Sequence, residues 1–189
     1  MLISIVYDSG YGHTKKQAEA VAEGVAKVTG VEVKLIAVAD HPAPWETLEK
    51  SDAIIFGSPT YNGLVSAKFK QFMEDATKPV WRELKWRNKI TAAFTNSGAQ
   101  SGDKLNVLVS IALFAAQHGM IWVGLDLMPG NSSSTGGVND LNRLGSWLGA
   151  MAQSNGDQGP DATPIESDLK TAAYLGQRVA EITQKFNDH

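Results

Sequence analysis

The chain contains no cysteine among its 189 residues. This absence excludes disulfides, thiolate metal sites, iron–sulfur clusters and a cysteine nucleophile. Any redox chemistry in this protein therefore depends on a bound organic cofactor.

Concentrated positive charge is also missing. The 17 Lys and Arg residues are scattered along the chain, the formal net charge is -3 and the sequence pI is about 5.8. Nucleic-acid-binding domains carry clustered basic residues, so the sequence does not indicate a nucleic-acid partner.

The beginning of the chain lacks the marks of a leader or a membrane span. Residues Met1 to Tyr7 have no charged segment before them and form an apolar run too short to cross a bilayer. We expect no membrane association and a cytoplasmic location. The four histidines, His13, His41, His118 and His189, show no paired ligand spacing, so we expect no metal site.

The apolar segments alternate between strand-like and helix-like patterns. This rhythm predicts an α/β fold: a three-layer, doubly wound, five-stranded parallel sheet with strand order 2-1-3-4-5. We expect one domain over residues 1–189. The predicted strands are Leu2–Tyr7, Val31–Val38, Ala53–Gly57, Ile90–Thr95 and Met120–Leu125. The first predicted helix follows Thr14. The others cover Trp45–Lys50, Ser66–Ala76, Asp103–His118 and the end of the chain to about Phe186.

Two features stand apart from this rhythm. Residues Leu127 to Thr163 are rich in Gly, Ser, Asn and Asp around one apolar patch at Leu144–Met151, and a long irregular segment of this kind is usually functional. The sequence Thr163-Pro164-Ile165-Glu166 then predicts a capped start for the last helix, with Thr163 as N-cap and Glu166 completing a capping box.

Three predicted strands end in loops whose composition favours binding. In doubly wound parallel sheets, ligands bind outside the carboxyl ends of the strands. The first loop, Ser9-Gly10-Tyr11-Gly12-His13-Thr14, offers hydroxyls and free backbone N–H groups at the positive end of a helix, as a phosphate site requires. Because it lacks the Walker and dinucleotide patterns, a terminal monophosphate fits it best.

The second and third loops offer contacts for a flat polar ring. Ser58-Pro59-Thr60-Tyr61-Asn62-Gly63 supplies a ring, a hydroxyl and an amide. Thr95-Asn96-Ser97-Gly98-Ala99-Gln100-Ser101-Gly102 supplies N–H donors without bulk. Each loop taken alone also fits an ordinary turn.

Together these loops resemble those of the flavodoxin superfamily, and most closely of its WrbA-type NAD(P)H:quinone oxidoreductases. The resemblance covers nearly the whole chain. It rests on the motifs Tyr11-Gly12-His13, Gly57-Ser58-Pro59-Thr60, Thr95-Asn96-Ser97-Gly98 and Ala116-Gln117-His118-Gly119-Met120.

The resemblance implies one FMN, with NADH or NADPH as electron donor. The cofactor's phosphate would lie on Ser9, Gly10, Tyr11, Gly12, His13 and Thr14. Its ring would be bordered by Pro59, Thr60, Tyr61, Asn62 and Gly63. Its pyrimidine edge would be held by Thr95, Asn96, Ser97, Gly98, Ala99, Gln100, Ser101 and Gly102. Tyr11 and Trp81 would contact the substrate, and His118 would contact the flavin.

Two departures from the family pattern affect the walls of this expected site. Tyr61-Asn62-Gly63 replaces an Arg and an aromatic residue that the family usually carries. The apolar segment Leu144–Ala150 stands where the family has a Gly-rich stretch with Pro-Tyr, so we expect a bulkier wall over the flavin.

The position of His118 indicates shared sites. It closes a helix of sixteen residues that starts at the predicted ligand-binding edge, which carries it roughly 24 Å away at about 1.5 Å per residue. It could therefore serve a flavin only in another subunit, and the same argument covers Trp81. We expect a homo-oligomer, a tetramer by resemblance. An interaction of His118 with the helix dipole is the alternative explanation.

The leading functional hypothesis is an FMN-dependent NAD(P)H:quinone oxidoreductase acting on small-molecule quinones, with no catalytic side chain beyond those that position the ligands. A flavodoxin-type electron carrier is the alternative, although such carriers rely on strongly acidic docking faces and this chain's net charge is small. An FMN-binding structural or regulatory protein without turnover is the third hypothesis.

Overall fold

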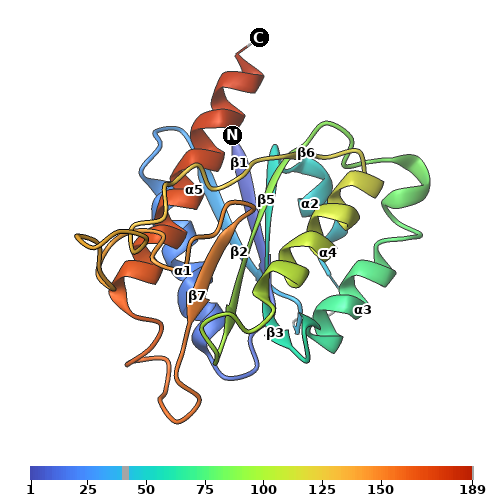
Figure 1. Cartoon of the computed structure of the whole chain (residues 1–189). Helices are drawn as coiled ribbons and strands as arrows, with labels where there is room; N and C mark the ends of the chain where they lie inside the picture. Colours follow the sequence, from blue (N-terminus) through green and yellow to red (C-terminus); the bar gives the residue numbers. More distant parts are fainter. Residues whose placement is uncertain (40–42, 189) are drawn as a thin grey trace.

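The computed structural model describes residues 1–39 and 43–188, so His41 and His189 lie outside the described residues. Its parallel strands are ordered β2-β1-β3-β5-β6, with β7 also paired to β5 (Figure 1). Counted as successive units of the chain, this is the predicted order 2-1-3-4-5, so the predicted fold class is confirmed. The strands are β1 (Leu2–Tyr7), β2 (Glu32–Ala37), β3 (Ala53–Tyr61), β4 (Leu64–Val65), β5 (Ile90–Ser97), β6 (Ile121–Trp122) and β7 (Ala150–Gln153).

The central strands are buried on both faces because helices cover both sides of the sheet. Residues 53–60 of β3 and all of β5 are buried, as their apolar sequences require. Helices α1 and α5 pack on one face, and α2, α3 and α4 on the other. The helices are α1 (His13–Ala26), α2 (Trp45–Lys50), α3 (Ala67–Asp75), α4 (Lys104–Gln117) and α5 (Glu166–Asn187), with a short 3-10 helix η1 (Trp81–Glu83).

Helices α1 and α5 lie against each other through glycine. A Cβ atom on Gly24 would stand 1.8 Å from the carbonyl oxygen of Ala173, and one on Gly176 would stand 2.1 Å from that of Val21. Both distances are shorter than any real contact, so these two positions admit no side chain. The close approach fixes α1, whose first turn borders the functional site, against the long terminal helix.

The fifth strand of the fold is divided into two pieces. β6 pairs with Ile90 and Thr91 at the start of β5, whereas β7 pairs with the end of β5, from Phe94 to Ser97. Between them, the N–H of Leu125 donates to the carbonyl of Trp147 instead of to the sheet, at 2.9 Å. The predicted strand Met120–Leu125 was therefore too long. The apolar patch at residues 144–151 contains the start of the other half of the strand.

Two further predictions about local structure were wrong. The loop predicted at Ser58–Gly63 is largely strand, because β3 runs to Tyr61 and turns through Asn62 and Gly63 into β4. Both turn residues have positive φ, 49° and 80°, as a two-residue hairpin turn requires.

The capping box predicted for the last helix does not form. Ile165, not Thr163, is the N-cap of α5, and no side chain caps it. Glu166 pairs with Lys170 at 2.9 Å instead of reaching back to the chain before the helix. The carbonyl of Thr163 accepts a hydrogen bond from His13 Nδ1 at 2.9 Å, which holds this segment against the start of α1.

None of the described helices is long and apolar enough to cross a membrane.

An aromatic cluster fills the layer beneath α3 and α4. Trp86 is fully buried and contacts Phe56, Phe72, Phe114 and the ring of His118, whose centroid lies 5.2 Å from that of Trp86. His118 is only 3% exposed, and its Nδ1 lies 2.8 Å from the carbonyl of Phe114. The ring's Nε2 and the Trp86 Nε1 are buried without a hydrogen-bond partner.

Burial lowers the pKa of His118, although the bond to Phe114 opposes this shift. The unfolded chain therefore binds a proton that the folded protein does not, and folding stability is lost as pH falls from the unfolded value of about 6.5 through the folded pKa. Each unit of difference between the two pKa values contributes about 1.4 kcal/mol. Urea unfolding between pH 7.5 and 5 should show a steeper loss of unfolding free energy for the wild type than for His118→Phe. Equal slopes would contradict this assignment.

Candidate functional site

The first loop begins at the carboxyl end of β1 and ends in the first turn of α1. Ser9 Oγ accepts hydrogen bonds from the N–H groups of Gly12 and Lys15, both at 3.1 Å. Gly12 takes a φ of 92° at the N-cap position, and no side chain caps the helix. Within the described residues, the backbone N–H groups of Tyr11, His13 and Thr14 donate to no protein acceptor. The loop thus presents unpaired donors at the positive end of α1, which suits an anion.

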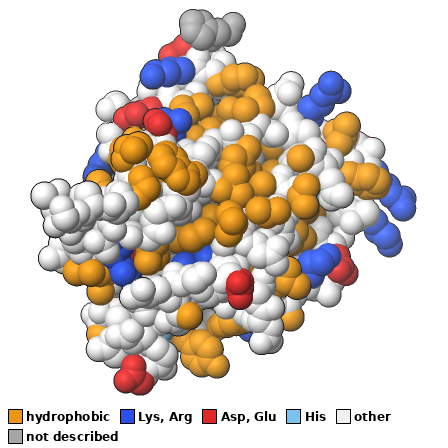
Figure 2. Space-filling model, viewed as in Figure 1, with side chains coloured by type: hydrophobic (Ala, Val, Ile, Leu, Met, Phe, Trp, Pro, Cys, Tyr) orange, Lys and Arg blue, Asp and Glu red, His pale blue; other side chains and the backbone are white. Residues whose placement is uncertain are grey.

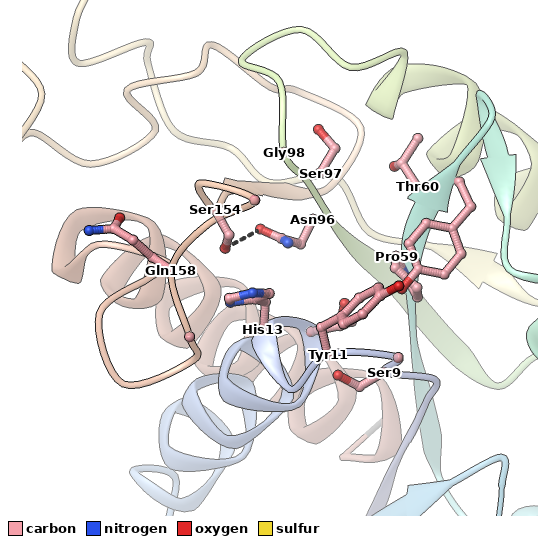
Figure 3. Close-up of a pocket in the computed structure, with 15 residues that line it drawn as sticks. Ser9, Tyr11, His13, Pro59, Thr60, Asn96, Ser97, Gly98, Ser154 and Gln158 are labelled. Atoms are coloured by element: carbon pink, nitrogen blue, oxygen red, sulfur yellow. Dashed lines mark hydrogen bonds between the residues drawn. The ribbon is translucent and has the colours of Figure 1, made fainter.

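His13 adds its ring to this loop. Its Nδ1 donates to the carbonyl of Thr163, which leaves Nε2 for a ligand. In Figure 3 the ring lies between Tyr11 and the segment that carries Ser154 and Gln158.

The second loop borders the first through two tyrosines. The Tyr61 hydroxyl lies so close to Gly10 that a Cβ atom there would stand 2.4 Å from it. The rings of Tyr11 and Tyr61 meet edge to face at 6.5 Å, and Tyr11 is 77% exposed. Partial burial, followed by the neighbouring Tyr11 and Asp8, raises the pKa of Tyr61, so its hydroxyl stays protonated at neutral pH. Two phenol groups therefore stand at the rim of the site.

A hydroxyl pair joins the second loop to the third. Thr60 Oγ1 and Thr95 Oγ1 lie 2.8 Å apart, and both side chains are buried. Asn96 and Ser97 continue β5 to the rim, and Gly98 begins the turn beyond it. The third loop is thus an extension of the central sheet.

The remainder of the third loop folds around a buried lysine. Lys104 Nζ donates to Ser97 Oγ, to the carbonyl of Ala99 and to that of Gln100, at 2.9, 2.8 and 2.7 Å. Burial lowers the pKa of Lys104 to about 8, a shift that Asp168 opposes. A Cβ atom on Gly102 would stand 2.1 Å from Ser97 Oγ, so the turn also requires glycine there.

A fourth segment, which sequence reasoning did not assign to the site, completes the wall. The N–H of Ser154 donates to the carbonyl of Ser97 and its hydroxyl donates to Asn96 Oδ1, both at 3.0 Å. Gly156, Gln158 and Gly159 follow and line the same cavity. The signal for this segment was present in the irregular composition of residues 127–163, but nothing in that composition indicated which residues face the site.

A buried ion pair supports this fourth segment. Arg143 Nε and Nη2 bind both carboxylate oxygens of Asp168 at 2.8 and 2.7 Å, and both side chains are nearly inaccessible. Asp168 Oδ2 also accepts the N–H of Gln153 at 2.9 Å, while Gln153 Nε2 donates to the carbonyl of Gly98 at the same distance. The Gln153 residue therefore links the ion pair to Gly98 in the third loop.

The four segments enclose a cavity of about 500 Å³ at the carboxyl edge of the sheet (Figure 3). Its volume falls in the range of small-molecule sites. No Asp, Glu, Lys or Arg is among the described residues that line it, so its polarity comes from hydroxyls, amides and backbone groups. The lining residues are Ser9, Gly10, Tyr11, His13, Thr14, Pro59, Thr60, Tyr61, Asn96, Ser97, Gly98, Ser154, Gly156, Gln158 and Gly159.

The structure thus brings most of the residues predicted from the three loops to one cavity. The others do not line it: they are Gly12, Asn62, Gly63, Thr95, Ala99, Gln100, Ser101, Gly102, Trp81 and His118. Gly12, Thr95 and Gly102 shape the loops from behind. Trp81 is 46% exposed and belongs to η1, which follows α3 at the opposite end of the sheet from the cavity (Figure 1). His118 is enclosed in the aromatic cluster, so contact with a flavin of another subunit would require its ring to leave that cluster.

The arrangement suits a phosphorylated flat ring. Unpaired N–H groups at the start of α1 offer a place for the phosphate, and uncharged polar groups at the ends of β3, β5 and β7 offer edge contacts for a heterocycle. A nucleotide cavity at this edge of a 2-1-3-4-5 sheet defines the flavodoxin-like class.

Comparison with known proteins agrees with this class. Residues 1–133 match the family described as NADPH-dependent FMN reductase, and the chain belongs to that family. The chain is 42% identical over 97% of its length to Flavodoxin FldP of Pseudomonas aeruginosa, of which it covers 97%. It is 35% identical to an NAD(P)H dehydrogenase (quinone) of Archaeoglobus fulgidus, with 97% of this chain and 98% of that protein covered.

A solved structure is similar over the same extent. The crystal structure of a flavodoxin, WrbA-like protein from Agrobacterium tumefaciens superimposes with a TM-score of 0.74 at 36% identity, covering 97% of this chain and 98% of that one. The resemblance to WrbA-type proteins found in the sequence is thereby confirmed.

The backbone of the first loop allows a sharp test. In Gly12→Ala, the alanine would have a φ of 92° and its Cβ would stand 2.8 Å from Pro160 Cγ. In Gly30→Ala, the alanine would have a φ of 80°, but its Cβ would have no atom within 4 Å. The unfavourable φ costs about 1–2 kcal/mol at either position. Thermal unfolding should therefore show a clearly larger loss for Gly12→Ala than for Gly30→Ala. Equal losses would mean that the contact with Pro160 is not made.

Proposed function

We propose that the cavity binds FMN and that the protein is an FMN-dependent NAD(P)H oxidoreductase that reduces quinones. One observation carries the proposal: unpaired N–H groups at the start of α1 and an uncharged polar wall face one cavity, in a chain of the FMN reductase family. No Asp, Glu, Lys or Arg among the described residues lines the cavity, so the phosphate is held by backbone donors, hydroxyls and the helix end.

The first loop fits a terminal phosphate. The Ser9 oxygen already accepts two N–H groups, which leaves its hydroxyl proton for a phosphate oxygen. Thr14 and the N–H groups of Tyr11 and His13 supply further donors, and His13 Nε2 stands beside them. A Cβ atom at Gly10 would stand 2.4 Å from the Tyr61 hydroxyl, so a side chain there would displace the Tyr61 ring from the cradle.

The ends of β3, β5 and β7 suit the ring. Thr60, Asn96 and Ser154 are held by hydrogen bonds to their neighbours, so a ligand meets groups already in place. FMN, when bound, supplies the two-electron redox chemistry that the cysteine-free chain lacks. The protein's own residues orient the ring, exclude water from one face and place N–H donors at the pyrimidine edge.

The predicted site residues divide into two roles in this proposal. Pro59, Thr60, Tyr61, Asn96, Ser97 and Gly98 contact the ring. The turn residues behind them hold the loops: these are Gly12, Asn62, Gly63, Thr95, Ala99, Gln100, Ser101 and Gly102. Tyr11, exposed at the rim, meets the nicotinamide or quinone substrate. Trp81 reaches a site only in another copy of the chain, and His118 does so only if its ring leaves the aromatic cluster.

Relatives support the choice of substrates. The protein from Archaeoglobus fulgidus and a second relative from Geobacter sulfurreducens, 34% identical over 99% of this chain, are both named NAD(P)H dehydrogenase (quinone). A rim with two phenols, and with no Asp, Glu, Lys or Arg in the part of the chain that the structure describes, suits a neutral aromatic acceptor.

A flavodoxin-type electron carrier is the second candidate. It is favoured by the 42% identity to Flavodoxin FldP over nearly the full length of both chains. A carrier recognises its partners through charged docking faces, and a net charge of -3 spread over 189 residues provides little of that. The quinone reductase therefore remains the preferred function.

Steady-state turnover separates the two candidates. With FMN bound, the chain should oxidise NADH or NADPH rapidly when benzoquinone is added, and this oxidation should stop when FMN is removed. FMN fluorescence quenching and a raised melting temperature measured beforehand establish that the cofactor binds. Quenching without turnover would leave the electron carrier, and absence of quenching would reject the whole proposal.

We also propose that the protein is a homo-oligomer, a tetramer by its resemblance to WrbA-type proteins. Leu105, Val109 and Leu113 project from α4 at four-residue spacing and are 58%, 39% and 63% exposed. Trp147, 56% exposed, lines a groove together with Leu105 and Val109. Figure 2 shows hydrophobic side chains gathered over this face with few charges among them. A second copy suits it because identical uncharged helix faces pack together without repulsion.

Charge placed on this face should separate the subunits. Sedimentation should give a mass well above the 20.3 kDa of one chain for the wild type and a single-chain mass for Leu105→Glu/Leu113→Glu. Leu35→Glu, at a 44% exposed leucine on the edge strand β2, serves as the control and should leave the mass unchanged. A wild type that sediments as a monomer would reject the oligomer.

A further inference from the structure

Lys104 is a lysine without any exposed surface, at the first position of α4. Its ammonium donates to three oxygens of the third loop, namely Ser97 Oγ, Ala99 O and Gln100 O. Within the described residues it has no ion-pair partner. Burying a cation is costly unless its surroundings compensate the charge. Here the direct contacts are neutral oxygens, and the Asp168 carboxylate acts on the ammonium without forming an ion pair.

The ammonium stands directly behind the wall of the cavity. Ser97 lines the cavity, and its hydroxyl oxygen lies 2.9 Å from Lys104 Nζ. The charge is therefore one hydrogen bond away from a residue that faces the ligand. Because the interior screens charges far less than water does, the charge acts on whatever occupies that side of the cavity.

Two other charged groups act on Lys104, and the attraction of Asp168 exceeds the repulsion of Arg143. Asp168 on α5 and Arg143 in the segment between β6 and β7 affect it in opposite directions, and these two residues form a buried bidentate pair. Asp103, its neighbour in sequence, lies at the start of the same helix. Among these groups, Lys104 is the one whose charge directly contacts Ser97, Ala99 and Gln100 of the third loop.

We propose that Lys104 is a positioning residue that sets the redox potential of the bound cofactor, by fixing the third loop and by placing a positive charge behind the ring edge. The inference rests on the proposed function. Reduction of a flavin adds negative charge at its pyrimidine edge, and a positive charge behind that edge favours the reduced form. The same charge acts less on the oxidised ring, which is neutral.

The charge of Lys104 also depends on pH. Because its pKa is lowered to about 8, the ammonium begins to lose its proton just above neutrality. The negative charge of a reduced ring would raise this pKa, so reduction would be coupled to proton uptake by Lys104. The midpoint potential should accordingly fall more steeply with pH above about 8 than below it.

Two variants separate the charge from the hydrogen bonds. Lys104→Met removes both, whereas Lys104→Gln retains two N–H donors without the charge. Lys89→Met is the matched control: Lys89 is also partly buried and donates to the carbonyls of Glu49 and Ser51. It precedes β5, roughly 26 Å from the strand's carboxyl end at about 3.3 Å per residue.

The experiment is a potentiometric titration of bound FMN between pH 6 and 9.5, with FMN dissociation constants measured for the oxidised form. In both Lys104 variants the preference for reduced over oxidised FMN should fall on the order of tenfold, which is about 30 mV for a two-electron couple. The extra pH dependence above pH 8 should disappear. Lys104→Met should also bind oxidised FMN less tightly, and Lys89→Met should match the wild type in every measurement.

Three outcomes would overturn the inference. One is a midpoint potential unchanged in both Lys104 variants, which would limit the residue to loop stability. Another is a potential that shifts in Lys104→Met and not in Lys104→Gln, which would assign the effect to hydrogen bonding. The third is an equal shift in Lys89→Met. Failure of the wild type to bind FMN would instead reject the proposed function, and this is seen before any potential is measured.

Discussion

The cavity depends on the parallel pairing of β5 with two partners at its carboxyl end. β3 pairs with it from Ala53 opposite Ile90 to Pro59 opposite Asn96, and β7 pairs with its last four residues. This register brings the ends of three strands to one level, beside the loop that leaves β1. If β7 did not return to the sheet, Ser154 and the glycines after it would have no fixed position, and the cavity would lack its fourth wall.

The polar interior behind this edge has a cost that the packing has to offset. Arg143 and Asp168 are removed from water, and such a pair is poor evidence for stability by itself. Its geometry suggests a different benefit, since Asp168 also holds the backbone of Gln153, whose side chain holds Gly98. Lys104 fixes the other side of the same turn. Three buried charged side chains, namely Lys104 and the Arg143–Asp168 pair, thus help to fix a loop of small residues.

A quinone reductase and an electron carrier could use the same cavity, because both need only a tightly held flavin. They differ in what surrounds it: an enzyme needs room for two substrates at the ring, whereas a carrier needs a docking face for proteins. The exposed Tyr11 and the uncharged rim favour small aromatic substrates. The apolar face of α4 favours association between copies of the chain over transient, charge-guided encounters.

The sequence by itself determined the sheet order and three of the four walls of the cavity. Both follow from patterns that are local in the sequence. Strands buried on both faces are continuous apolar runs, and glycine-rich turns after them indicate the carboxyl edge at which ligands bind in this class of fold. Prediction from the sequence failed where a hydrogen-bond partner far away along the chain determines the local conformation. Thr163 has the side chain of a good N-cap, yet its carbonyl binds His13 and the helix starts later.

Only the tertiary structure showed that residues 150–153 complete the fifth strand and that Lys104 is buried. The segment Ala-Met-Ala-Gln contains no β-branched or aromatic residue that would predict a strand. A lysine next to Asp103 in the sequence is expected to be exposed to solvent. Both are fixed by hydrogen-bond partners that lie far away along the chain or across the turn, and local patterns carry no record of such partners.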